Sequence, residues 1–295
     1  MAKLNLAIIG VGLIGGSLGL ALKDKLKDDI YVTGLSRTEE SMANAINCGA
    51  VDFASADVEQ VVKDADVVYL STPVLQIIPM VKKILPFLKS GAIITDAGST
   101  KEVVGTAIKE LLPTDIYYVS GHPMTGKEKS GVQAADKDLF KHKSYVIIDD
   151  DTVPAEIRKK ITDLLELTGA NLTTLDFAKH DRCASIISHV PHVAAAALVT
   201  LLNRSAGDMD SCLKLAGGGF KDTTRIASSN SDMWADICMT NSAAIAGHLR
   251  DLQAILGEVI TQIEAGDRQA VHDYFAAAKT RRDNILDKTE KMFEI

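Results

Sequence analysis

Short apolar runs alternate with helical patterns in the first part of the chain. The runs cover residues 4–9, 30–35, 66–71, 91–96, 117–120 and 144–148. Between them apolar residues recur with helical spacing, as in residues 17–26 after the first run. Apolar runs of this length, bounded by turn residues, are typical of strands that are buried on both faces. Their alternation with helices predicts a doubly wound, mainly parallel sheet.

The pattern changes near Leu172. From Ala178 onward the apolar positions follow helical periodicity, with almost no strand signal. We therefore predict an α/β domain over residues 1–172 and an all-helical domain over residues 173–295. No linker rich in Gly or Ser separates them, so we expect the two domains to pack closely.

The helical region contains three long helical patterns, over residues 185–202, 239–263 and 267–293. The first is apolar nearly all round, and a helix of that kind needs burial on several sides. An intertwined homodimer would supply this burial, so we expect the helical domain to form the dimer interface and to complete the functional site.

A glycine-rich turn connects the first predicted strand to the first helix. It fits the pattern GxGxxG between a strand and a helix, the context in which this pattern predicts a Rossmann dinucleotide-binding domain. The glycines let the backbone approach a pyrophosphate, which the positive end of the helix then attracts. We also assign to this site the two residues that stop the strand 66–71. The predicted cofactor residues are Gly10, Gly12, Leu13, Ile14, Gly15, Thr72 and Pro73.

The end of the second predicted strand bears on the choice between NAD and NADP. An acidic residue there binds the ribose 2′-hydroxyl and repels a 2′-phosphate. This chain has Ser36 at that place, followed by Arg37, and this combination favours NADP. Glu39 and Glu40 are close in sequence and could offset part of the charge of Arg37, so NAD stays possible.

Polar residues that could carry chemistry cluster in a few segments. Residues 96–101 and 121–128 each follow a predicted strand, where ligands of α/β proteins gather. In the second segment His122 is the best candidate for a general base, although a structural His beside a turn proline is the competing interpretation. In the helical region Arg225 is the best candidate for binding a carboxylate. The competing interpretation is a surface salt bridge, which is the commoner role of an arginine.

The ordered motifs resemble the prephenate and arogenate dehydrogenases of tyrosine biosynthesis. They are GVGLIGGS at the start, DAGSTK, GHPMTGKEKSG, SHVPH, and GGGFKDTTRIA leading to Trp234. The resemblance implies oxidative decarboxylation of a cyclohexadienyl substrate with hydride transfer to NAD or NADP. It implies that His122 contacts the ring hydroxyl and that Ser99 lies near that hydroxyl and the nicotinamide. Arg225 would bind a substrate carboxylate and His192 would line the pocket.

Three further residues take roles from the resemblance alone. Glu128 and Asp222 match positions implicated in ion pairs of the pocket, and Trp234 matches one that reaches the site of the neighbouring subunit. The stretch containing Glu128 favours prephenate over arogenate by likeness to bacterial prephenate-using relatives. Loss of CO₂ and gain of aromaticity make the reaction downhill, so we expect no metal ion.

Two rival classes remain at this point. A β-hydroxyacid dehydrogenase has the same architecture but usually carries a catalytic Lys early in its second domain, and residues 185–192 contain two His and no Lys. A nucleotide sensor without turnover would keep the glycine-rich turn but would not need His122 together with Arg225.

Composition limits the classes of partner that we expect for this protein. The 295 residues carry a net charge of −7, which argues against nucleic acid. The four cysteines are scattered without zinc spacing, as in a cytoplasmic protein with reduced thiols. No apolar run looks long enough to cross a bilayer, so we expect no membrane partner. We expect no mutase or regulatory domain in this protein, so any feedback by tyrosine would act at the active site.

Overall fold

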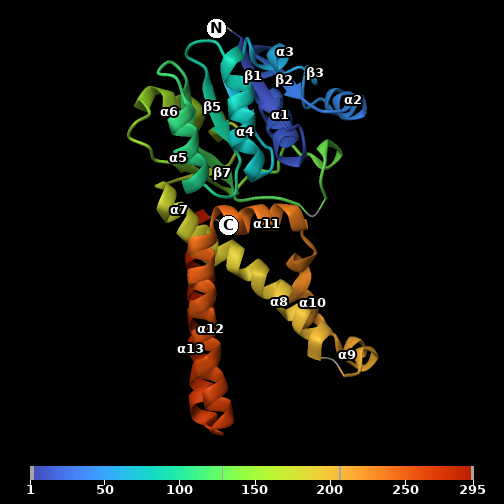
Figure 1. Ribbon diagram of the computed structural model, residues 1–295, viewed down its shortest axis with the longest axis vertical. Coiled ribbons are helices and arrows are strands. Elements are labelled where there is room, and N and C mark those ends of the chain that lie inside the picture. Colours follow the sequence, from blue (N-terminus) through green and yellow to red (C-terminus); the bar gives the residue numbers. More distant parts are fainter. Residues whose placement is uncertain (1–2, 128, 206, 294–295) are drawn as a thin grey trace. The chain divides into compact units, whose positions relative to one another are not determined.

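The computed structural model describes residues 3–127, 129–205 and 207–293 (Figure 1). Its main sheet has six parallel strands in the order β3-β2-β1-β4-β5-β6. The order turns back at β1, as in a Rossmann fold, so the predicted doubly wound α/β architecture is confirmed. The strands are β1 (Leu4–Ile9), β2 (Ile30–Leu35), β3 (Phe53–Ser55), β4 (Val67–Leu70), β5 (Ile93–Asp96) and β6 (Tyr117–Val119).

The two-residue periodicity of the strands divides the core into two layers. Along β1, Leu6 and Ile8 belong to one apolar cluster, whereas Ala7 and Ile9 belong to the other. Helices α1 (Leu13–Leu26) and α6 (Ala155–Glu166) contribute to the first cluster. The opposite face is covered by α3 (Val58–Val62), α4 (Val74–Ile84) and α5 (Glu102–Leu111). The short helix α2 (Glu39–Asn47) adds Ala45 to the first cluster.

A second, three-stranded sheet corrects the prediction for residues 144–148. It consists of β7 (Gly121–Pro123), β8 (Ser144–Ile148) and β9 (Asn171–Leu175) in the order β7-β8-β9. Strand β7 runs antiparallel to β8, and β8 runs parallel to β9. The apolar run of β8 therefore does not extend the main parallel sheet. Because β7 follows β6 after Ser120 alone, the chain leaves the main sheet just before His122.

The region after β9 is helical, as predicted. The continuous segment Phe177–Arg204 comprises α7 (Phe177–Ala184), a π-helical turn (Ser185–His189) and most of α8 (Val190–Ser205). The helices α9 (Met209–Leu215), α10 (Gly218–Thr224) and α11 (Ser231–Thr240) follow, with a 3₁₀ turn (Arg225–Ser228) between the last two.

The chain divides into two compact units, residues 1–242 and 243–295. The second unit consists of the long helix α12 (Ser242–Glu264) from Ala243 onward and of α13 (Arg268–Phe293). A turn with Gly266 at a φ of +66° joins the two helices. The domain boundary near Leu172 stays a prediction.

The helical segment Phe177–Arg204 corrects the expectation that no apolar stretch is long enough to cross a bilayer. Its most apolar window of 18 residues has a mean hydropathy of 1.7, and only 17% of that window is buried. By length and composition alone, this helix could cross a membrane. The expectation was wrong because it counted uninterrupted apolar runs, whereas the helix stays apolar on average across His189, Pro191 and His192.

Candidate active site

The glycine-rich turn has the geometry of a pyrophosphate cradle. A Cβ atom on Gly15 would lie 2.4 Å from Ser71 Oγ and 2.6 Å from the carbonyl oxygen of Gly10, so only glycine fits there. Gly10 itself has a φ of +91°. At Gly12, by contrast, a Cβ atom would meet no described atom within 4 Å. Helix α1 begins at the next residue, with no acidic side chain in its first turn, so its positive end is available to an anion.

The other predicted cofactor residues lie at the same edge of the sheet. Thr72 and Pro73 follow β4, and the Thr72 hydroxyl is buried without a hydrogen-bond partner among the described residues. At the end of β2, Ser36 is 8% exposed and its backbone N–H donates to Ser55, while Arg37 is exposed. Parallel register places the ends of β1, β2 and β4 side by side. These residues therefore suit a nicotinamide dinucleotide, which supplies a hydride acceptor when bound.

A buried ion pair joins the loop after β5 to strand β7. The Lys101 ammonium pairs with the Asp96 carboxylate and donates to the carbonyl oxygen of Gly121 at 2.8 Å. Both charged side chains are fully buried. Burial lowers the pKa of Lys101, and the Asp96 carboxylate acts in the opposite direction. Ser99 lies in the loop that this pair closes and His122 follows Gly121, so the pair constrains the spacing between the two predicted catalytic residues.

The second carboxylate oxygen of Asp96 binds three groups around β6 and β7. The Tyr118 hydroxyl donates to it at 2.9 Å, the Ser120 hydroxyl at 3.1 Å and the backbone N–H of Gly121 at 3.1 Å. All three donors are buried. Asp96 is therefore fully hydrogen-bonded, as a buried carboxylate must be to avoid a large desolvation cost.

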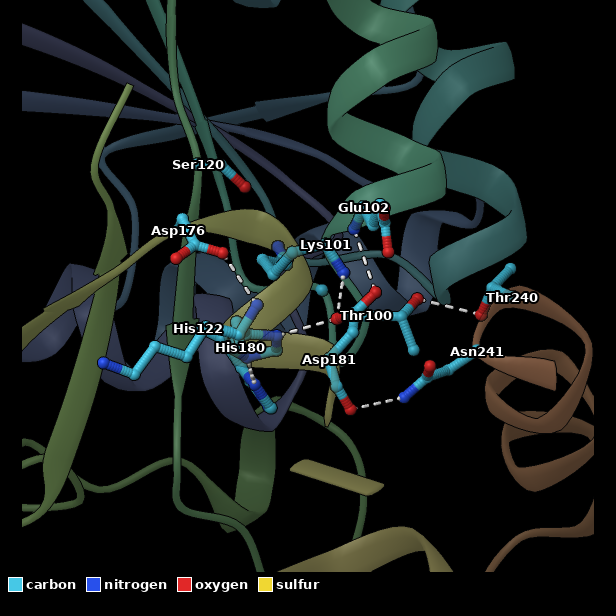
Figure 2. A network of polar contacts seen from close by, with 12 residues as sticks. Thr100, Lys101, Glu102, Ser120, His122, Asp176, His180, Asp181, Thr240 and Asn241 are labelled. Carbon is cyan, nitrogen blue, oxygen red and sulfur yellow. Dashed lines mark hydrogen bonds and ion pairs between the residues drawn. The ribbon is translucent and has the colours of Figure 1, made fainter. Parts of the chain in front are cut away.

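His122 lies on β7 at the start of a chain of buried polar groups (Figure 2). Its Nδ1 is 2.8 Å from Nε2 of His180, and Nδ1 of His180 is 2.8 Å from Oδ1 of Asp181. The Asp181 carboxylate also accepts the backbone N–H groups of Lys101 at 2.8 Å and Glu102 at 2.9 Å. His122 is 9% exposed, and His180 and Asp181 are 2% exposed. The other ring nitrogen of His122, Nε2, takes no part in this series of hydrogen bonds.

The environment of His122 favours the neutral imidazole. Burial is the largest cause that holds its pKa well below the ordinary 6.5, and the electrostatic effects of His180, Lys101 and His189 act in the same direction. An imidazole that is neutral at physiological pH can accept a proton, as the predicted general base must.

A second cluster gathers the histidines of the SHVPH motif around Trp234. The ring of His192 stacks on Trp234 at a centroid distance of 3.7 Å, and His189 meets the same indole edge-on at 6.0 Å. His192 Nδ1 donates to the carbonyl oxygen of Ser188 at 2.8 Å, since a carbonyl can only accept. Burial lowers the pKa of His189 to about 4.

Arg225 lies near this cluster, and Asp222 precedes it by three residues on α10. Both side chains are exposed, at the end of α10 and the start of the following 3₁₀ turn. Burial lowers the pKa of His192, and the positive charge of Arg225 adds to this effect, so the guanidinium is near the His192 ring. Glu128 lies outside the described residues. In this single chain Trp234 packs against His192, and its predicted role at a neighbouring subunit stays a prediction.

The structure adds residues to the site that the sequence analysis did not select. His180 is in direct contact with the predicted base and Asp181 contacts His180, while Asn241 donates to the Asp181 carbonyl oxygen at 2.8 Å (Figure 2). The signal available in the sequence was a His-Asp pair at the start of the first helix after the last strand. Among the described residues, no group of three or more His, Cys, Asp or Glu side chains could hold a metal ion.

Comparison with known proteins places this arrangement in a family. The model described as "Prephenate dehydrogenase, nucleotide-binding domain" matches residues 18–174, and "Prephenate dehydrogenase, dimerization domain" matches residues 176–277. The prephenate dehydrogenase of Bacillus subtilis is 33% identical over 284 residues, which make up 96% of this chain and 76% of that protein.

Two solved structures are similar over nearly the whole chain. The prephenate dehydrogenase from A. aeolicus, crystallised with hydroxyphenyl propionate and NAD⁺, has a TM-score of 0.89 at 29% identity and covers 97% of this chain and 99% of its own. The Synechocystis arogenate dehydrogenase has a TM-score of 0.83 at 27% identity, over 96% of this chain and 100% of its own. The resemblance carried by the sequence motifs is thereby confirmed, and this nicotinamide-dependent dehydrogenase belongs to the prephenate dehydrogenase family.

Proposed function

We propose that this chain oxidises prephenate to 4-hydroxyphenylpyruvate and CO₂ and passes a hydride to a nicotinamide cofactor. The observation that carries the proposal is the environment of His122. This imidazole is buried, its pKa is held below the ordinary value, and its Nδ1 is engaged by His180. Its Nε2 is therefore the atom that would receive a proton from the substrate.

The proposed reaction balances with one proton acceptor and one hydride acceptor. The ring carbon that bears the hydroxyl loses a hydride to the nicotinamide, while the hydroxyl proton moves to Nε2 of His122. The bond between the ring and its carboxylate then breaks, CO₂ leaves, and the bonding electron pair completes the aromatic ring. The phenolate oxygen that results takes the proton back from His122, which gives the hydroxyl group of the product. The protein's contribution is to orient the groups and to hold the base neutral beforehand.

The remaining residues would hold the substrate. Ser99 lies in the loop that the Asp96–Lys101 pair ties to the His122 strand, which suits contact with the ring hydroxyl. Arg225 and His192 are near each other and could bind a substrate carboxylate, as a cation and a hydrogen-bonding ring do. We include Asp222, Glu128 and Trp234 in the same pocket on the strength of the family resemblance.

We propose that the cofactor is NADP in preference to NAD. Ser36 has no carboxylate to repel a 2′-phosphate, and Arg37 next to it is exposed and could bind one. The A. aeolicus relative was crystallised with NAD⁺, so NAD is the alternative. Likewise arogenate is the alternative substrate, since the Synechocystis relative is an arogenate dehydrogenase.

We propose that the enzyme is a cytoplasmic homodimer whose helical regions cover one another. The segment Phe177–Arg204 leaves large apolar side chains exposed, among them Ile187 at 67% and Leu201 at 57%. The start of this helix carries His180 and Asp181, which hydrogen-bond into the nucleotide-binding domain. A second copy therefore explains the apolar surface better than lipid does.

The experiment that tests the proposed function is steady-state kinetics with three candidate substrates and two cofactors. The absorbance of the reduced nicotinamide is followed with prephenate, arogenate and, as a rival substrate, a β-hydroxyacid. The proposal expects the highest kcat/KM with prephenate. Turnover with the hydroxyacid alone, or cofactor binding with no turnover of any substrate, would instead support one of the two rival classes.

A further inference from the structure

We propose that His180 and Asp181 are positioning residues that set the tautomer of His122, and that Asp181 also links this base to the loop of Ser99. The inference rests on the proposed function, in which His122 accepts the hydroxyl proton. Its basis is the unbroken chain of buried contacts from Asp181 through His180 to His122, each 2.8 Å long.

The direction of this chain follows from what each atom can donate. An ionised carboxylate can only accept, so His180 Nδ1 must carry the hydrogen that points to Asp181. In a neutral His180 the other nitrogen, Nε2, is then an acceptor. It faces His122 Nδ1, which must therefore be the protonated nitrogen of that ring. The lone pair of His122 is left on Nε2, where a base needs it.

Asp181 performs a second task with the same carboxylate. Its Oδ1 accepts the backbone N–H of Lys101 and its Oδ2 accepts that of Glu102, at the start of α5. These two residues end the loop that begins at Asp96 and contains Ser99. One carboxylate therefore holds both the His180–His122 pair and the end of the Ser99 loop. Asn241 holds the backbone of Asp181 in turn, through its carbonyl oxygen.

The chain also stabilises the charge that forms during the reaction. Burial opposes a positive charge on His122 and so lowers its pKa. When His122 takes up the proton, its Nδ1–H still donates to His180, and the Asp181 carboxylate lies at the far end of the same chain. Hydrogen-bonded chains of this kind polarise one another in a low-dielectric interior, so Asp181 can offset part of the cost.

The first test measures the tautomer directly and requires no turnover. Enzyme containing ¹⁵N-labelled histidine is studied by NMR in complex with its cofactor, with His122→Asn used to identify the His122 signals. We expect the hydrogen on Nδ1 in the wild type and its loss from that nitrogen in part of the His180→Leu molecules. A wild-type His122 with its hydrogen on Nε2 would overturn the proposal, whether or not the enzyme uses prephenate.

The second test separates positioning from folding by kinetics. His180→Gln keeps a side-chain acceptor near His122, whereas His180→Leu removes it. We expect kcat to fall roughly a hundredfold in His180→Leu and markedly less in His180→Gln, with the cofactor KM and the melting temperature little changed in both. His272→Leu, at an exposed histidine of α13, is the matched control. A His180→Leu enzyme with the kcat of this control would overturn the proposal.

Discussion

His122 combines burial with neighbours that can carry positive charge, and this combination determines how the enzyme should respond to acid. Its pKa lies well below 6.5, first because of burial and then because of His180, Lys101 and His189. A base acts in its unprotonated form, so activity is present above its pKa and is lost as the pH falls through it. We predict that kcat is retained as the pH falls through 6.5 and declines only at lower pH.

The kcat of the wild type, measured from neutral to acidic pH in the presence of saturating substrate and cofactor, checks this prediction. A half-loss of kcat at pH 6.5 or above would mean that the base has an ordinary pKa and that His122 is not held neutral by its surroundings. A parallel unfolding curve shows whether the decline belongs to catalysis or to denaturation.

Ser36 and Arg37 provide a second prediction at the level of single residues. Ser36→Asp places a carboxylate where the 2′-phosphate of NADP would lie, so kcat/KM for NADP should fall relative to that for NAD. Arg37→Ala removes a charge-assisted contact of about 1.5–3 kcal/mol, so the ratio should shift in the same direction by roughly tenfold to a hundredfold. Lys27→Ala, a surface cation after α1, is the control. A wild type that prefers NAD, with a ratio unaffected by Arg37→Ala, would refute the assignment.

At the scale of elements, two glycines of the turn between β1 and α1 allow effects on cofactor binding to be distinguished from effects on folding. A methyl group on Gly12 would meet no atom of the described residues within 4 Å, whereas one on Gly15 would collide with Ser71 Oγ and the Gly10 carbonyl oxygen. We predict that Gly12→Ala weakens cofactor binding by about tenfold or more without lowering the melting temperature, because it narrows the approach of the pyrophosphate. Gly15→Ala should lower both the cofactor affinity and the melting temperature.

Cofactor titration and thermal unfolding of the two variants check this contrast. Equal cofactor affinity in Gly12→Ala and the wild type would mean that the pyrophosphate does not approach the backbone at Gly12. An unchanged melting temperature in Gly15→Ala would mean that the turn relaxes more easily than its close contacts imply.

The elements of the main sheet could be predicted because each carries its own signal. In β1 the four buried residues, which face both helical layers, are all apolar, so the strand gives a nearly continuous apolar run. β8 has the same signal, yet it belongs to another sheet, because a local pattern does not identify the partner strand. β7 is too short and carries the polar His122, and β3 is equally short, so neither gave a strand signal.

Only part of the candidate site could be predicted from the sequence. The glycine-rich turn, His122 and Arg225 could be selected because motifs and side-chain chemistry are visible in short stretches of sequence. The contact between His122 and His180 joins residues 58 positions apart, and that between Asp181 and Lys101 spans 80. Such pairings depend on how β7, α5 and α7 pack, which no local pattern encodes.

At the scale of the whole molecule, the exposed apolar side chains of the helical region predict assembly. We expect light scattering at micromolar concentration to give about twice the 31.6 kDa mass of one chain. Leu201→Asp, on α8, should weaken the dimer because it places a charge on the exposed apolar surface. Ile46→Asp, at a similarly exposed apolar position on α2, should not. A monomeric wild type would contradict the proposed interface.

The proposed oxidation of prephenate depends on His122 as the base. The most direct measurement compares kcat for prephenate in the wild type and in His122→Asn, together with the cofactor dissociation constant of each. We predict turnover of prephenate by the wild type, a loss of about a hundredfold or more in the variant, and equal cofactor affinity in both. Unchanged turnover in His122→Asn, or a wild type that binds the cofactor but does not oxidise prephenate, would contradict it.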